Sequence, residues 1–185
     1  MATYNKRGYK APKPEEAKVE NEFDEVEAVD ATEKNDSLYN LALKGGEGKL
    51  GFIGIAEQYA GTDAGNLANY HAGMAYLNLG DFKNAITYLE KFKSDDAILK
   101  PIALGAIGDA LSETNKVDDA ISYYKQAAEA SENDFTTPRY LLKAAQLYLT
   151  AGKKAEAHAL FVEIKEKYET SKEGMNIDAF IAMTE

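Results

Sequence analysis

The stretch from Tyr70 to Ile86 reads YHAGMAYLNLGDFKNAI, and its order of small and large side chains predicts the fold. If Gly80 is taken as a turn, a small residue (Gly73) lies seven positions before it and an aromatic residue (Tyr76) lies four before it. Ala85 follows five positions after the turn. Small residues let two helices approach closely, and large residues fill the space beside that contact. The stretch therefore indicates two helices joined at Gly80.

The same order recurs along the chain, as expected of a repeat protein. Five residues after each turn stands a small residue, and four positions further stands a large one. The turns are Gly46, Gly80, Asn115 and Gly152, at intervals of 34, 35 and 37 residues. The small residues are Gly51, Ala85, Ala120 and Ala157, and the large ones are Ile55, Leu89, Tyr124 and Phe161. One such unit cannot bury its own faces, so we expect the units to stack.

This pattern resembles the tetratricopeptide repeat (TPR). The resemblance implies an all-α fold, a right-handed α-solenoid of about four antiparallel helix pairs with a C-terminal capping helix. The repeat before Gly46 is the least regular, because Gly51 stands where the second helix should have Ala. We predict helix pairs near 36–59, 66–93, 100–130 and 138–168, and a cap near 175–184.

The chain is predicted to divide into a charged, disordered tail at 1–35 and a repeat domain at 36–185. The tail has few large apolar side chains to offset the entropy of ordering. Its charge is split, since Lys6 to Lys13 is basic and Glu15 to Asp36 is mainly acidic. The tail is either a solvated segment or a docking or targeting arm.

Composition argues against several classes of function. The chain has 31 acidic and 21 basic residues and a formal net charge of -10, whereas nucleic-acid binding needs a surplus of Lys and Arg. It has no Cys, which excludes disulfides, thiolate catalysis and Cys-based zinc sites. The apolar stretch from Leu50 to Ala56 is far shorter than the ~20 residues of a membrane helix. We therefore expect a soluble chain that does not bind nucleic acid.

Two further patterns carry no catalytic prediction. The stretch 46–51 reads GEGKLG and matches GxGxxG, but a dinucleotide site needs a preceding strand, and no strand pattern occurs in the chain. We interpret it as a glycine turn between paired helices. His71 and His158 fall in different repeats without a shared ligand spacing. We expect no catalytic residue, no cofactor and no metal, and hence no enzyme.

The resemblance implies that a peptide or helix of another protein binds in a concave groove lined by the first helix of each pair. Tyr70, Met74 and Leu77 share one helical face that is not the core face of their repeat, so we expect them to form an apolar floor. Arg139 and Lys143 lie four apart and could steer an acidic stretch of the ligand. The groove positions are Tyr70, Met74 and Leu77, then Gly105, Asp109 and Ser112, then Arg139, Leu142, Lys143, Gln146 and Leu149. Of the polar members, Asp109 could select against the wrong charge.

The leading hypothesis is an adaptor or assembly factor with a protein or peptide as partner. The alternatives are a self-assembling repeat module and a non-catalytic subunit of an enzyme complex. The chain also resembles bacterial envelope proteins that have a short cytosolic tail, one membrane helix and a periplasmic repeat domain, and that are associated with protein export or envelope assembly. The basic start suits such a tail. The membrane helix of those proteins is missing here, so either it was removed from this version or the resemblance misleads and the protein is cytosolic. We favour the first alternative, which implies the cell envelope.

Overall fold

The computed structural model describes residues 33–185. The predicted disordered tail at 1–35 therefore lies almost entirely outside the described residues. The chain divides into two units, 1–38 and 39–185, and the second unit holds the repeats.

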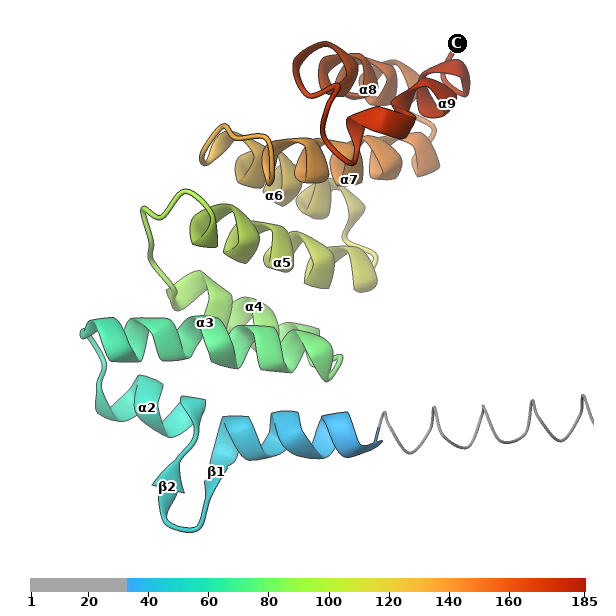
Figure 1. Ribbon diagram of the computed structural model, residues 1–185. Coiled ribbons are helices and arrows are strands. Elements are labelled where there is room, and N and C mark those ends of the chain that lie inside the picture. Colours follow the sequence, from blue (N-terminus) through green and yellow to red (C-terminus); the bar gives the residue numbers. More distant parts are fainter. Residues whose placement is uncertain (1–32) are drawn as a thin grey trace, which may run out of the picture. The chain divides into compact units, whose positions relative to one another are not determined.

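Helices follow one another through the second unit, and each helix from α2 to α8 contacts the next along the chain (Figure 1). Helix α3 also contacts α5, and α9 contacts α8. Residues 39–44 are helical, and the elements after them are β1 (Gly45–Gly46), β2 (Lys49–Leu50), α2 (Phe52–Gln58), α3 (Asp63–Asn78), α4 (Phe82–Lys91), α5 (Leu99–Glu113), α6 (Val117–Glu129), α7 (Thr137–Thr150), α8 (Lys154–Lys167), the 3₁₀-helix η1 (Gly174–Asn176) and α9 (Ile177–Ala182). The predicted fold class, an all-α solenoid of helical hairpins, is confirmed.

Three of the predicted turns end their helices in the same way. Gly80, Asn115 and Gly152 all have positive φ, at 72°, 59° and 74°. The residue after each turn donates its backbone N–H to a carbonyl five residues earlier, for example Asp81 N–H to Tyr76 O at 2.9 Å. A left-handed residue at the helix end lets the following N–H bind a carbonyl of the last turn that would otherwise lack a hydrogen-bond donor. Asn adopts the conformation more readily than most non-glycine residues, which explains why Asn115 serves as well as Gly.

The small residues of the pattern lie at the closest helix contacts. Ala85, Ala120 and Ala157 are each 0% exposed. A Cβ added at Gly73 would lie 2.5 Å from Leu89 Cγ, and one at Gly108 would lie 2.7 Å from the ring of Tyr124. The small residue of one helix therefore receives the large residue of its partner, as the spacing predicted.

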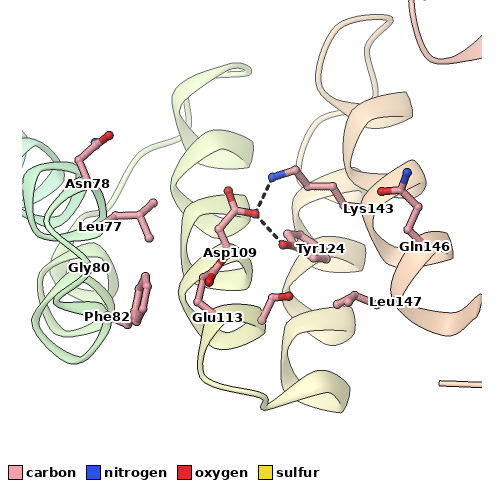
Figure 2. A pocket seen from close by; sticks show the side chains of 11 residues that line it. Leu77, Asn78, Gly80, Phe82, Asp109, Glu113, Tyr124, Lys143, Gln146 and Leu147 are labelled. Atoms are coloured by element: carbon pink, nitrogen blue, oxygen red, sulfur yellow. Dashed lines mark hydrogen bonds and ion pairs between the residues drawn. The ribbon is translucent and has the colours of Figure 1, made fainter. Parts of the chain in front are cut away.

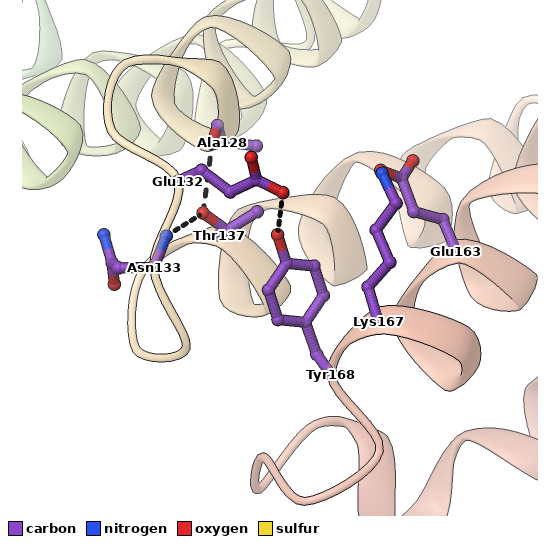
Figure 3. A network of polar contacts seen from close by, with 7 residues as sticks. All are labelled: Ala128, Glu132, Asn133, Thr137, Glu163, Lys167 and Tyr168. Carbon is purple, nitrogen blue, oxygen red and sulfur yellow. Dashed lines mark hydrogen bonds and ion pairs between the residues drawn. The ribbon is translucent and has the colours of Figure 1, made fainter.

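Polar contacts join positions one repeat apart. Tyr123 O–H donates to Glu90 Oε1 at 3.3 Å across 33 residues, and Tyr168 O–H donates to Glu132 Oε1 at 3.0 Å across 36 residues. Figure 3 shows the second contact, which ties the end of α8 to the loop between α6 and α7. In the same network Thr137 O–H donates to Ala128 O at 3.2 Å. The repeats from α3 to α8 are thus held to one another by hydrogen bonds as well as by apolar packing.

The region around Gly46 differs from the prediction. Gly46 has no positive φ; it pairs with Lys49 in an antiparallel hairpin, β1–β2, whose two loop residues are Glu47 (φ 53°) and Gly48 (φ 76°). The glycine turn that the sequence predicted between paired helices is therefore a short hairpin. Two consecutive left-handed residues give the turn that reverses a short hairpin. Strands of two residues are too short to leave an alternating pattern in the sequence.

The C-terminal end carries the expected cap. Ile177 is 1% exposed, and the ring of Phe180 lies 5.2 Å from that of Phe161, centroid to centroid. His158 Nδ1 lies 2.9 Å from the hydroxyl of Thr184, beyond the end of α9. Within residues 33–185, no helix is both long and apolar enough to cross a membrane.

Candidate protein-binding groove

A cavity of about 610 Å³ lies between the ends of α3, α5 and α7 and is called the groove here (Figure 2). Its walls combine apolar and polar side chains. The apolar ones are Leu77, Phe82 and Leu147, and the charged ones are Asp109, Glu113 and Lys143. Asn78, Ser112 and Gln146 add neutral polar groups. Three successive repeats therefore contribute to one surface.

Four residues assigned to the binding surface from sequence lie together in the groove. Leu77 comes from α3, Asp109 from α5, and Lys143 and Gln146 from α7. Asp109 and Gln146 occupy the same repeat position, six residues before the turns Asn115 and Gly152. Ser112, another family groove position, lines the same cavity.

Tyr70 and Met74 are not in the lining of the groove. Both are half-buried and pack against the larger core cluster, which includes residues of later repeats. The ring centroid of Tyr70 lies 5.1 Å from that of Phe92, which follows the end of α4. Burial raises the pKa of the Tyr70 hydroxyl. Leu77 packs against the same cluster, but it is the only one of the three that also lines the groove.

Arg139 and Gly105 also lie away from the lining. The guanidinium carbon of Arg139 lies 5.5 Å from the ring centroid of Phe135, and both residues are exposed. Gly105 is covered by Tyr140, because a Cβ added to Gly105 would lie 2.0 Å from Tyr140 Cε1. Leu142 and Leu149 pack against the core cluster. The basic pair expected from sequence is therefore divided, with Lys143 alone in the groove.

Asp109 is the centre of the polar contacts in the groove. Its Oδ1 accepts hydrogen bonds from Tyr124 O–H and from Lys143 Nζ, each at 2.6 Å (Figure 2). The ammonium of Lys143 also lies 5.5 Å from the ring centroid of Tyr124. Charge-assisted hydrogen bonds of this length are among the stronger polar contacts in proteins. They hold Lys143 in one place, and they bridge two repeats.

Two stacked tyrosines lie beneath this contact. The rings of Tyr124 and Tyr140 are 6.3 Å apart with an interplanar angle of 15°. Burial and the hydrogen bond to Asp109 raise the pKa of Tyr124 far above its usual range, so its hydroxyl stays a donor. Burial and the nearby Asp109 raise the pKa of Tyr140 to about 12.

The role of Tyr124 was missed by sequence reasoning, which assigned it to core filling. Leu89 and Phe161 occupy the corresponding positions in the neighbouring repeats. A hydroxyl at a buried position needs a hydrogen-bond partner, and that requirement was the available signal.

Comparison with family models identifies the repeat. Two models, each described as tetratricopeptide repeat, match residues 68–94 and 106–171, together about half of the chain. The chain is a TPR protein. The first match falls on α3 and α4 and the second on α5 to α8. A search of curated proteins and a search of solved structures each gave no match.

Every residue that lines the groove of this TPR protein falls within one of the two matched ranges. TPR repeats serve in general as scaffolds for contacts between proteins. The hairpin β1–β2 and α2 precede both matches, in agreement with the irregular first repeat.

Proposed function

We propose that this TPR protein is an adaptor that binds a segment of another protein in the groove. The observation that supports the proposal most is the groove itself, which has a volume of about 610 Å³ and walls drawn from three successive repeats. A cavity of this size, with apolar walls and a few placed polar groups, is typical of ligand sites. Because the walls belong to helices one repeat apart, an extended peptide or a single helix fits the groove better than a compact ligand.

Ser112 offers a direct test, because the chain has no native cysteine. We would replace Ser112 with Cys, attach a photoreactive group to the single thiol, irradiate it in an extract of the source cell, and identify crosslinked proteins by mass spectrometry. Thr87→Cys is the matched control, because Thr87 is an exposed residue of α4 outside the groove lining.

We expect a protein adduct on Ser112→Cys that is absent from Thr87→Cys. A second change, Leu77→Arg, places a long charged side chain in the groove and should abolish the adduct without changing the circular dichroism spectrum. Equal adducts from both labelled positions, or an adduct that survives Leu77→Arg, would contradict binding in the groove.

A narrower proposal is that the adaptor works in the bacterial cell envelope, in protein export or envelope assembly. The order of a basic segment, Lys6 to Lys13, and an acidic segment before the repeats supports it, through the resemblance noted above. Fractionation of source cells with an antibody to the repeats tests this: recovery in the cytoplasmic fraction alone would contradict it.

Self-association is a second candidate function. Leu41, Leu50, Tyr59 and Leu67 are large apolar residues with 44% to 56% of their surface exposed, and all four precede the middle of α3. Exposed apolar side chains are common at protein interfaces. Light scattering during size-exclusion chromatography distinguishes a dimer from the monomer of 20.2 kDa.

A further inference from the structure

We infer that the groove selects a basic segment: a Lys or Arg of the partner binds Glu113 and the free oxygen of Asp109, with its aliphatic part against Leu77 and Phe82. This inference rests on the proposed function and adds the charge of the partner. It reverses the expectation from sequence, in which Lys143 and Arg139 attract an acidic ligand.

The charges in the groove are unequal once the internal ion pair is counted. The charged side chains of the lining are Asp109, Glu113 and Lys143. Lys143 Nζ lies 2.6 Å from Asp109 Oδ1 and is therefore neutralised within the protein. Glu113 is exposed and has no ion pair within residues 33–185. The groove thus presents one uncompensated negative charge, which complements a basic group.

The hydrogen-bonding capacity of Asp109 supports the same conclusion. Tyr124 and Lys143 both donate to Oδ1, and no residue of the described part donates to Oδ2. The side chain of Asp109 is 34% exposed, so Oδ2 is open to the groove. In Figure 2 both dashed lines start from one oxygen of Asp109, and none reaches the second. A guanidinium or ammonium has donors to spare for such an oxygen.

Glu113 follows Asp109 by one helical turn on α5, so the two carboxylates share a face. Like charges at this spacing repel, and a cation between them relieves the repulsion. The opposite wall holds Leu77 and Phe82, which suits the methylene groups of a long basic side chain. Carboxylates on one wall and apolar groups on the other match the two parts of Lys or Arg.

An acidic ligand would have to compete with Asp109 for Lys143. Breaking that contact would leave a partly buried carboxylate with Tyr124 as its only donor. Arg139 lies outside the lining, so it cannot replace Lys143. Loss of Lys143 should therefore weaken the binding of an acidic ligand but not that of a basic ligand.

The experiment uses a random dodecapeptide library displayed on phage, selected on the whole chain. Enriched peptides are synthesised, and their dissociation constants are measured on the wild type and on variants whose folding is checked by circular dichroism. We expect enrichment of Lys or Arg beside apolar residues. Glu113→Gln should weaken binding about fivefold or more, whereas the matched control Glu129→Gln, an exposed residue of α6 outside the groove, should change it less than twofold.

Lys143→Met distinguishes a preference for basic ligands from a preference for acidic ones. It removes the positive charge at similar length, so basic peptides should bind at least as tightly as to the wild type, and acidic ones should be lost. Acidic enrichment, or loss of binding in Lys143→Met, overturns the inference while the proposed function stands. If Leu77→Arg leaves the dissociation constants of all enriched peptides unchanged, the proposed function fails, and the inference fails with it.

Discussion

Replacing Gly105 with Ala should destabilise the protein, although the same change in most helices stabilises it. An added Cβ would lie 2.0 Å from Cε1, 2.2 Å from Cζ and 2.6 Å from the hydroxyl oxygen of Tyr140. That ring is 4% exposed and is stacked on Tyr124, so it has no room to move aside. Overpacking of a well-packed core costs about 1–3 kcal/mol, and contacts this short place the cost near the upper value.

The intrinsic gain of Ala over Gly in a helix offsets about 1 kcal/mol of this. We therefore expect a net loss of about 1–2 kcal/mol, or a melting temperature lower by about 2–8 °C for a chain of this size. Urea denaturation followed by circular dichroism measures the loss. The control is Gly54→Ala in α2, whose added Cβ would meet Leu50 Cδ2, the end of an exposed side chain, at 2.9 Å.

Gly54→Ala should be neutral or stabilising, because the Leu50 side chain is free to rotate away. If Gly105→Ala proved as stable as the wild type, the tight contact between α5 and Tyr140 would not exist in solution, and the placement of the stacked Tyr124 and Tyr140 rings beneath Asp109 would be wrong.

Three further predictions concern packing, pH and the tail. Ala120→Leu should lower the free energy of unfolding by roughly 1–3 kcal/mol, because Ala120 is 0% exposed. Gly46→Ala should lower it less, because the added Cβ meets only the exposed Leu41 side chain. Equal losses for the two variants in urea denaturation would refute this. Between the ordinary tyrosine pKa of 10.0 and the pKa of about 12 for Tyr140, the unfolded chain loses a proton that the folded protein retains, so stability should fall as pH rises. Tyr140→Phe should reduce that fall by about 2 kcal/mol, measured by denaturation at pH 9 and at pH 12. An unchanged pH dependence would count against the burial of this hydroxyl. Deletion of residues 1–30 should leave the melting temperature almost unchanged in calorimetry, because the segment has few apolar side chains to dock; a clear drop would show that it does dock.

The repeat positions were predictable because their causes are local. A left-handed residue ends a helix, and a small residue permits a close contact, whatever lies elsewhere in the chain. Gly80, Asn115 and Ala120 could therefore be assigned from spacing alone. The hairpin at Gly46 could not, because Glu-Gly is not a usual pair for a two-residue turn.

The site was less predictable, because its contacts join different repeats. Leu77, Asp109 and Lys143 were assigned to one surface by family position, and all three line one cavity of the structure. That Lys143 binds Asp109 depends on how far successive helix pairs are rotated. Spacing within a repeat contains no information about that rotation.

The polar contacts between repeats, each spanning 33 to 36 residues, have a kinetic consequence. Each closes a loop of about one helix pair, so no step of folding must bring distant parts of the chain together, and the entropic cost of each step is similar. Such topologies fold fast for their size. They also open one unit at a time, and a unit at an end of the stack opens more readily than one with neighbours on both sides. Amide hydrogen exchange should therefore be fastest in α2 and slow progressively toward α6 and α7.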